Sequence, residues 1–131
     1  MGATLRYAKV IDREEHQRHG AEVKPGLDSV VRLKGPAPSP AIDFYVIRSW
    51  SGDFDAFTET WRILDPHGMT VHESVSREVL AGHGEIADEI VDLHFDYADA
   101  GFQLVLEVDE VEVARAGFTV VADDETGRDG G

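Results

Sequence analysis

Residues 95–121, FDYADAGFQLVLEVDEVEVARAGFTVV, constrain the fold more than any other part of the chain. Apolar side chains recur at every second position in the middle of this segment: Phe102, Leu104, Leu106 and Val108. Successive side chains of a β-strand point to opposite faces, so a period of two predicts strands with one buried face and one exposed face. The segment therefore predicts an all-β protein.

The last two strands of this segment are predicted to form a hairpin. One face of the hairpin stays apolar when the pairs are Phe102 with Phe118, Leu104 with Ala116, and Leu106 with Ala114. This register requires a three-residue loop of Asp109, Glu110 and Val111. Such loops usually contain a residue in the left-handed conformation, most often glycine, and this one has no glycine. The register is therefore predicted, whereas the turn type is left open.

Turn-forming residues divide the rest of the chain into further short strands. The expected strands lie at 4–11, 27–33, 42–50, 57–64, 69–75, the end of 77–90, and 91–97. About seven or eight short strands separated by turns are typical of an antiparallel β-sandwich. Residues 1–122 are therefore expected to form a single sandwich domain, and the polar, glycine-ended residues 123–131 to form a disordered acidic tail.

Three segments carry more specific expectations. Residues 42–50 are apolar at nearly every position, which indicates a strand buried on both faces or at the centre of a sheet. Residues 35–40 contain three prolines, which cannot donate to a β-ladder, and are expected to carry the chain from one sheet to the other. In residues 91–97, the side chains expected to point inward are Val91, Leu93, Phe95 and Tyr97.

Two turn signals separate the central strands. Asp65-Pro66-His67-Gly68 has proline where it presets φ and glycine where the chain can need a positive φ, and predicts a hairpin between 57–64 and 69–75. A short helical turn within 77–90 is the alternative to a loop followed by a strand. The loop and strand are favoured because Gly82 and Gly84 would interrupt a helix.

The net charge is −14, from 26 acidic and 12 basic residues. The negative electrostatic potential of such a charge repels phosphate backbones, which argues against a nucleic-acid partner. The chain has no cysteine, which excludes disulfides and thiolate metal ligands. There is no apolar run of about 18 residues that would span a membrane, and the first residues lack the apolar core of a signal peptide. A soluble, cytoplasmic protein without membrane contact is therefore expected.

Two sets of motifs resemble immunoglobulin-like sandwich domains. The first is Trp-x-Ile-x-Asp-Pro-x-Gly, at Trp61, Ile63, Asp65, Pro66 and Gly68. Further along come Tyr-x-Asp-x-Gly-Phe-x-Leu-x-Leu-x-Val-Asp and Val-Ala-x-Ala-x-Phe-x-Val, within residues 97–120. The resemblance covers about residues 56–122, and within the superfamily it is similar to macroglobulin-type domains and small prokaryotic single-domain proteins. It implies an immunoglobulin-like antiparallel sandwich with a binding or scaffolding role rather than catalysis.

Histidines are the first candidate metal ligands. His16 and His19 have the spacing of two ligands on one helical face, but a structural zinc site needs four ligands and no further pair accompanies them. His72 and His94 fall on outward strand phases and could converge only if their strands are neighbours. The histidines are therefore expected to be exposed, and no metal or other cofactor is assigned.

Acidic turns are the second candidate cation ligands. Asp53 and Asp55 lie in one expected turn, and Asp96 and Asp99 lie at the corner before the last hairpin. Loop carboxylates suit calcium, but neither pair matches the twelve-residue calcium loop. Short carboxylates also bind turn amides, and this structural role is the preferred interpretation.

Glu59 has the same strand phase as Phe57 and Trp61, which places a carboxylate on an apolar face. A buried carboxylate with a perturbed pKa would indicate a functional site. The alternatives are an edge position or an ion pair with an arginine such as Arg48. The nearby aromatic residues Trp50, Phe54 and Trp61 are candidates for a partner contact, because exposed aromatic side chains anchor interfaces.

No catalytic constellation is visible. The chain has no Gly-x-Ser-x-Gly elbow and no glycine-rich phosphate loop with its lysine. We therefore expect a non-enzymatic interaction module that binds a protein partner, or itself, through a sheet face or a strand edge. The alternative is a domain that binds a small ligand or a divalent cation through its acidic turns or histidines.

Overall fold

The computed structural model describes residues 2–13, 30–53, 55–80 and 85–122. These residues confirm the all-β class. Their strands are β1 Gly2–Asp12, β2 Val30–Arg32, β3 Ser39–Pro40, β4 Phe44–Asp53, β5 Ala56–Leu64, β6 Thr70–Glu73, β7 Arg77–Leu80, β8 Ile86–Ile90, β9 His94–Phe95, β10 Ala100–Val108 and β11 Val111–Val121. The strands outnumber the seven or eight expected because segments as short as β3 and β9 are too short to show a period.

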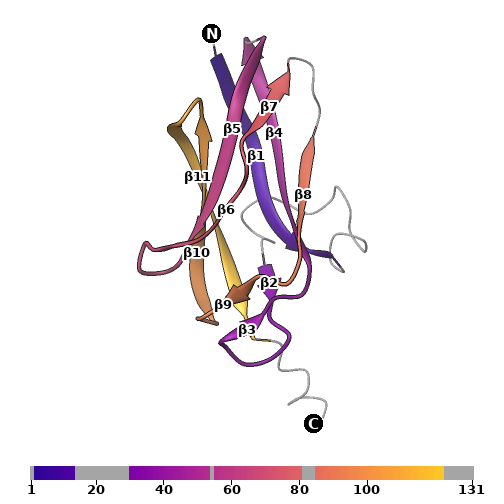
Figure 1. The fold of residues 1–131 in the computed structure, drawn as a ribbon, viewed down its shortest axis with the longest axis vertical. Helices are drawn as coiled ribbons and strands as arrows, with labels where there is room; N and C mark the ends of the chain where they lie inside the picture. The colour runs from indigo at the N-terminus through magenta and orange to yellow at the C-terminus, as the bar shows by residue number, and fades with distance from the viewer. Residues whose placement is uncertain (1, 14–29, 54, 81–84, 123–131) are drawn as a thin grey trace.

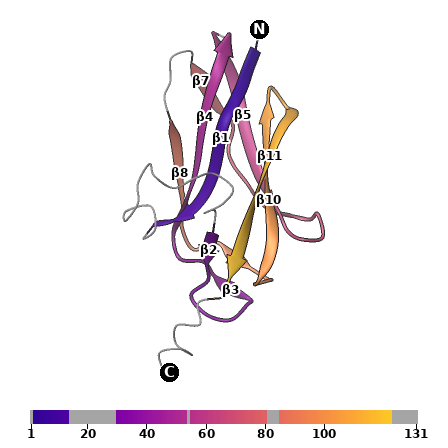
Figure 2. The ribbon, with the colours of Figure 1, turned by 180° about the vertical axis from the view of Figure 1, so that it is seen from behind.

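The strands form two larger sheets packed in a sandwich-like arrangement (Figure 1). The three-stranded sheet has the order β1-β4-β8. The six-stranded sheet has the order β2-β11-β10-β5-β6, and β7 also pairs with β5. A separate two-stranded ladder joins β3 to β9. The view from behind shows the long strands of both sheets running along the same axis of the molecule (Figure 2).

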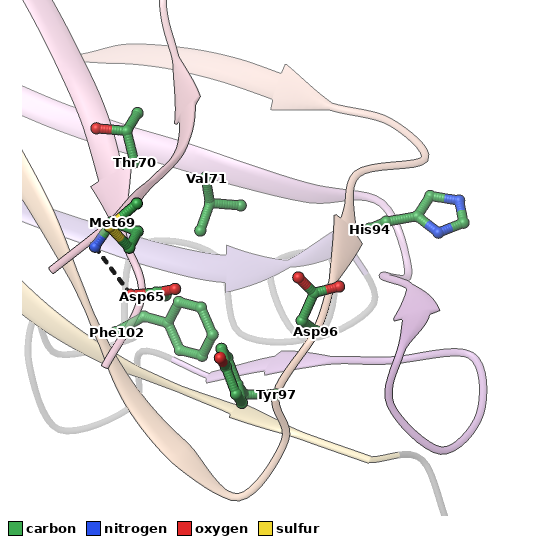
Figure 3. A pocket seen from close by; sticks show the side chains of 8 residues that line it. All are labelled: Asp65, Met69, Thr70, Val71, His94, Asp96, Tyr97 and Phe102. Carbon is green, nitrogen blue, oxygen red and sulfur yellow. Dashed lines mark hydrogen bonds between the residues drawn. The ribbon is translucent and has the colours of Figure 1, made fainter. Parts of the chain in front are cut away.

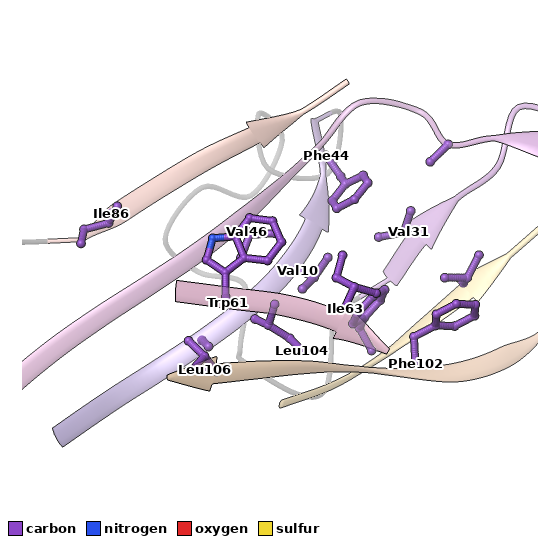
Figure 4. Close-up of a cluster of buried hydrophobic side chains, with 14 of the residues drawn as sticks. Val10, Val31, Phe44, Val46, Trp61, Ile63, Ile86, Phe102, Leu104 and Leu106 are labelled. Carbon is purple, nitrogen blue, oxygen red and sulfur yellow. The ribbon is translucent and has the colours of Figure 1, made fainter. Parts of the chain in front are cut away.

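The hydrophobic core lies between the two sheets (Figure 4). The three-stranded sheet contributes Val10, Phe44 and Val46, and the six-stranded sheet contributes Trp61 and Leu104, all of them almost completely buried. Burying a large apolar side chain stabilises a fold by about 1.5–3 kcal/mol. The alternation of apolar residues found in the sequence therefore places the two inner faces against each other.

The expectation for residues 42–50 is confirmed, because β4 is the central strand of its sheet. Its inner face contributes Phe44 and Val46 to the core. On the opposite face, Ile47 forms a second buried cluster with Ile11 of β1. Side chains on both faces of β4 are therefore buried, which explains the nearly continuous apolar run.

The proline-rich residues 35–40 connect β2 in the six-stranded sheet with β4 in the three-stranded sheet, as predicted. One feature of this region differs from the purely antiparallel expectation. β2 pairs with β11 in parallel, with Val30 opposite Thr119 and Arg32 opposite Val121. The partners lie in distant parts of the chain, so the local pattern carries no information about their relative direction.

The final hairpin has the predicted register: Phe102–Phe118, Leu104–Ala116 and Leu106–Ala114. The predicted three-residue loop is wrong. Val108 pairs with Val111, so the loop has two residues, and an irregularity between Leu106 and Glu107 absorbs the extra residue. Asp109 and Glu110 have φ values of 51° and 72°. Two positive φ angles are typical of the type I′ turn, whose twist matches that of the strands.

Two further turns decide how the chain leaves its strands. Gly68, with a φ of 85°, completes the predicted hairpin between β5 and β6.

The strand expected at 91–97 is mostly wrong, because Asp92 has a φ of 63° and interrupts the extended path. Only Phe95 of that segment is fully buried, whereas Val91 and Tyr97 are exposed. The strand expected at the end of 77–90 is confirmed as β8, whereas the start of the segment forms a further strand, β7; residues 81–84 between them lie outside the described set.

No helix in the described part of the chain has the length and apolar character needed to cross a membrane. The tail expected at 123–131 lies outside the described residues.

Candidate functional site

A cluster of charged and indole side chains lies between the two sheets. Arg48 of β4 and Glu59 of β5 form a completely buried ion pair, with Arg48 Nε donating to Glu59 Oε2 at 2.8 Å. Arg48 Nη1 also donates to the Val46 carbonyl at 3.0 Å. The indole Nε1 of Trp50 donates to the same Glu59 oxygen at 2.8 Å. The arginine partner considered for Glu59 is therefore confirmed, and the pair has a structural explanation.

Asp88 of β8 extends this cluster toward the side of the sandwich. Its Oδ2 accepts a hydrogen bond from Trp61 Nε1 at 2.9 Å and lies 3.2 Å from Arg48 Nη1. Its Oδ1 accepts a hydrogen bond from Arg77 Nη2 of β7 at 2.6 Å. Arg77 is half-exposed, whereas Arg48 is inaccessible to solvent. We call Arg48, Glu59, Asp88, Trp50 and Trp61 the buried charge cluster.

The two tryptophans are therefore not exposed anchors. Trp50 is 5% exposed and Trp61 is 1% exposed. Each indole N–H has a carboxylate partner inside the sandwich, so burial leaves neither donor unsatisfied. Phe54, the third aromatic candidate, lies outside the described residues. A partner contact on the described surface must therefore use side chains other than these two tryptophans.

A groove of about 460 Å³ opens along the side of the sandwich, above Asp88. Residues of β5, β6, β7 and β8 line it, together with the segments that follow β6 and β8. We call it the lateral groove, and its walls include Trp61, His72, Val75, Asp88, Ile90 and Val91. The groove lies where one edge of the six-stranded sheet faces one edge of the three-stranded sheet.

Strand β8 forms one of these edges. Among the described residues, β4 is the strand that pairs with β8, and no strand pairs with its other side. An edge of this kind presents a row of backbone N–H and C=O groups that can pair with another chain.

The ladder between β1 and β4 identifies which backbone groups of β8 point away from β4. The Arg13 N–H donates to the Asp43 carbonyl at 2.8 Å and continues the β1–β4 register. Successive residues of an antiparallel ladder direct their backbone groups to alternate sides, so Phe44 directs its N–H and C=O toward β8. The same alternation directs the N–H and C=O of Ala87 and Glu89 away from β4, to the free edge.

Apolar and acidic side chains border this edge. Val75 is 83% exposed and Val91 is 61% exposed, and both line the lateral groove. Three carboxylates line it as well, against one arginine: Glu73, Asp88 and Glu89 against Arg77. The groove therefore combines open apolar contacts with an acidic lining.

The three lining carboxylates differ in their partners. Asp88 is bound by arginines of the cluster and of β7. Glu89 accepts a hydrogen bond from Arg13 Nη2 at 2.5 Å. Glu73 is exposed, and no ion pair joins it to another described residue. Glu73 lies directly opposite Arg62 on β5, on the face of the six-stranded sheet that points away from the core.

At the start of β8, Glu85 accepts a hydrogen bond from the Tyr7 hydroxyl at 2.5 Å. This hydrogen bond, together with burial and the charge of Glu85, raises the pKa of Tyr7 above its usual value near 10. Arg13 also has a raised pKa, because of its hydrogen bond to Tyr45 and its contact with Glu89. These contacts join β1 to β8 across the outer face of β4.

A second hollow, of about 400 Å³, lies at the β5–β6 turn (Figure 3). Asp96, Tyr97 and Phe102 face it, whereas the imidazole of His94 points away from the other labelled side chains. Asp65 also lines it, but its Oδ1 accepts hydrogen bonds from the backbone N–H groups of His67 and Met69. The carboxylate of Asp65 therefore stabilises the turn.

Most of the candidate metal ligands lie within the described part of the chain. No group of three or more His, Asp or Glu side chains suited to a metal ion occurs among the described residues. Asp55 is exposed in a bend, Asp53 ends β4, and Asp99 lies in the left-handed region with a φ of 56°. The Asp99 N–H donates to the Val120 carbonyl at 2.6 Å. His16 and His19 lie outside the described residues.

His72 and His94 do not converge either, because β6 pairs with β5 and β9 pairs with β3. The outward phase expected for His72 is wrong. It pairs with Ile63, whose side chain is buried, and its ring packs against Trp61 with 5.5 Å between centroids. His72 therefore forms part of the wall of the lateral groove.

The sequence contained one overlooked sign of this site. In Ile86-Ala87-Asp88-Glu89-Ile90, an aspartate occupies the inward phase between two isoleucines, as Glu59 does between Phe57 and Trp61. Two carboxylates on inward phases indicate a polar cluster inside the core. The free edge beside them has no such sign, because it depends on the order of strands in both sheets.

No protein-family model matches the sequence, and no curated protein is significantly similar to it.

Proposed function

We propose that the protein is a non-enzymatic interaction module that binds an extended segment of a protein partner as an additional strand beside β8. The observation that carries the proposal is that one edge of β8, along the lateral groove, pairs with no other described strand. Strand addition uses backbone hydrogen bonds for affinity and pockets for alternate side chains for specificity. The backbone N–H and C=O groups of Ala87 and Glu89, which point away from β4, would form the hydrogen bonds. The groove beside Val75 and Val91 would accept the alternate side chains.

We further propose that the sandwich is immunoglobulin-like. In that fold one sheet has the strand order A-B-E-D and the other contains C, F and G. By chain order and pairing, β1-β4-β8 corresponds to A-B-E, and β5, β10 and β11 correspond to C, F and G. The place of strand D is taken in the sequence by β7, which pairs with β5 instead. The position beside β8 is therefore the one that strand D occupies in the four-stranded version of this sheet.

The charges of β8 favour a different protein as the partner over a second copy. If two β8 strands paired antiparallel about Asp88, each Asp88 would lie opposite its counterpart. Like charges directly opposite each other destabilise a β-ladder. The net charge of −14 also opposes self-association. Proteins protect edge strands against self-pairing in this way, with charged residues on the edge.

A selection from a random linear peptide library tests the proposal. We expect enriched peptides to bind the wild-type chain and the Ala87→Val variant, and to lose binding to Ala87→Pro. Proline at this edge position removes an N–H that points away from β4, so the β4–β8 ladder is kept. Bound peptide should also slow hydrogen exchange of the Ala87 and Glu89 amides. Enriched peptides that bind Ala87→Pro as tightly as wild type would contradict the proposal, and so would a selection without enrichment.

A further inference from the structure

We infer that the segment bound beside β8 presents a neutral hydrogen-bond acceptor to Arg77 in the lateral groove, such as the side-chain oxygen of threonine, serine or asparagine. This inference rests on the proposed function, since it names the side-chain chemistry of the partner at that same edge. It concerns one position of the segment, the position opposite Asp88.

The geometry of the sheet defines this position. β1, β4 and β8 pair antiparallel, and an added strand that continues this pattern also runs antiparallel to β8. Ala87 and Glu89 direct their backbone groups to the added strand, so Asp88 and the residue opposite it form a non-hydrogen-bonded pair. The side chains of such a pair are close together on the same face of the sheet. Because Asp88 lines the groove, the residue opposite it points into the groove as well.

Arg77 supplies hydrogen-bond donors beside this position. Its Nη2 donates to Asp88 Oδ1 at 2.6 Å, and no other hydrogen bond joins Arg77 to a residue that the structure describes. A guanidinium carries several N–H donors in a rigid fork. The side chain is 44% exposed and lines the groove with Asp88. An acceptor that enters the groove opposite Asp88 therefore meets the remaining N–H groups of Arg77.

Charge indicates that this acceptor is neutral. A carboxylate opposite Asp88 would place two like charges directly opposite each other, which destabilises a β-ladder. A lysine or arginine would compete for a carboxylate that Arg48 and Arg77 already contact, and would lie close to both cations. An apolar side chain would displace water from Arg77 without replacing its hydrogen bonds. A hydroxyl or amide oxygen accepts from Arg77 and avoids all three costs.

The flanking groove-facing position is apolar. Two residues along the segment, the added strand lies opposite Ile90, which lines the groove together with Val75 and Val91. Both valines are largely exposed, and an apolar side chain of the segment would cover them. The partner segment therefore alternates a neutral acceptor with apolar residues on its groove-facing side.

Three labelled seven-residue peptides test the inference by fluorescence anisotropy. They have the sequence Ser-Val-Ser-X-Ser-Val-Ser, in which X is threonine, valine or glutamate. Threonine and valine have nearly the same shape, and only threonine carries a hydroxyl group. We expect Arg77→Ala to reduce the affinity of the threonine peptide relative to the valine peptide about two- to tenfold, the contribution of one hydrogen bond. The glutamate peptide should bind more weakly than the threonine peptide, and tighter binding would overturn the inference.

The ratio of the two affinities isolates the hydrogen bond. Arg77→Ala also removes the aliphatic stem of the arginine, but this loss affects both peptides alike. Asp88 keeps its contacts with Arg48 and the Trp61 indole in this variant, so the groove is preserved. Arg115→Ala is the matched control, because Arg115 is 45% exposed and paired with a carboxylate, but lies on β11 outside the groove.

An unchanged ratio in Arg77→Ala, with binding of both peptides abolished by Ala87→Pro, would overturn the inference and leave the proposed function intact. An equal fall of the ratio in Arg115→Ala would also overturn the inference, since the preference would then not depend on the groove. Binding that is insensitive to Ala87→Pro, or no binding of any peptide at millimolar concentration, would overturn both.

Discussion

Glu59 accepts a hydrogen bond at 2.8 Å from the indole nitrogen of Trp50, and this bond crosses from the six-stranded sheet to the three-stranded sheet. Arg48, on the same strand as Trp50, donates to both oxygens of this carboxylate. One side chain of β5 therefore connects two side chains of β4 through the core. The connection makes Glu59 a bridge between the two sheets.

Glu59→Ala should destabilise the fold by about 3–5 kcal/mol, because it removes the closest partner of a completely buried guanidinium. Urea denaturation monitored by tryptophan fluorescence measures the change. Arg77→Ala is the control, since Arg77 is half-exposed and its ion pair with Asp88 should contribute only about 0–1 kcal/mol. Equal effects of the two variants would contradict the assigned role of Glu59.

The double variant Arg48→Met/Glu59→Leu should be far more stable than Glu59→Ala. Replacing both members of a buried ion pair with apolar residues is often neutral or stabilising, because neither charge of the pair is left buried without its partner. Denaturation midpoints of the two variants under the same conditions provide the comparison. A double variant as unstable as Glu59→Ala would mean that loss of the pair itself, and not an uncompensated charge, causes the destabilisation.

Gly68→Ala should destabilise the fold by about 1–2 kcal/mol, because Gly68 has a φ of 85° that alanine adopts at a cost. No atom lies within 4 Å of the added methyl group, so backbone strain accounts for the whole effect. Gly101→Ala is the matched control, since its added methyl group also meets nothing within 4 Å. Thermal unfolding should show a lower midpoint for Gly68→Ala and an unchanged or higher midpoint for Gly101→Ala.

Glu110→Gly should stabilise the fold by about 1 kcal/mol. Glu110 has a φ of 72° in the two-residue turn between β10 and β11, and glycine adopts this conformation without strain. The change converts Asp-Glu into Asp-Gly, a preferred type I′ pair. Glu110→Ala separates this effect from loss of the charge, and a midpoint as high in Glu110→Ala as in Glu110→Gly would argue against strain.

Stability should fall at alkaline pH through Tyr7. Its pKa is raised in the folded protein, chiefly because its hydroxyl donates to Glu85. A raised pKa means that the folded state retains the proton more strongly than the unfolded state, so the stabilisation is complete below about pH 10 and is lost as the pH rises through the folded pKa. Urea midpoints between pH 8 and 12 should fall less steeply for Tyr7→Phe than for wild type. Parallel curves would contradict the contribution of Tyr7.

Local patterns predicted much of the fold. The register of the last hairpin follows from alternation, since a slip by one residue would expose Leu104 and Leu106. Strand phase placed Glu59 on an apolar face and left a functional carboxylate, an edge position and an arginine partner as alternatives, of which the ion pair with Arg48 is the one observed. The strand predicted at 91–97 was mostly wrong because Asp92 adopts a positive φ, which the alternation of apolar residues does not reveal.

Long-range relationships could not be read from the sequence. The partner of the Trp61 indole is Asp88, on a strand of the opposite sheet, and no local pattern connects the two. Among the described residues, β8 has an edge without a partner strand, and β7 pairs with β5 in the other sheet. Edges, and the grooves between them, result from the order of strands in space.

The parallel pairing of β2 with the end of β11 also governs how the nascent chain matures. Val31 and Leu33 emerge from the ribosome early, and both are completely covered in the finished domain. Their ladder partner, residues 119–121, lies at the end of the last described strand, so this part of the sheet closes only after the other described strands have been synthesised. A ribosome that stalls before Thr119 would hold a chain in which the apolar side chains of Val31 and Leu33 lack their β11 partner. Exposed apolar surface of this kind is what chaperones recognise.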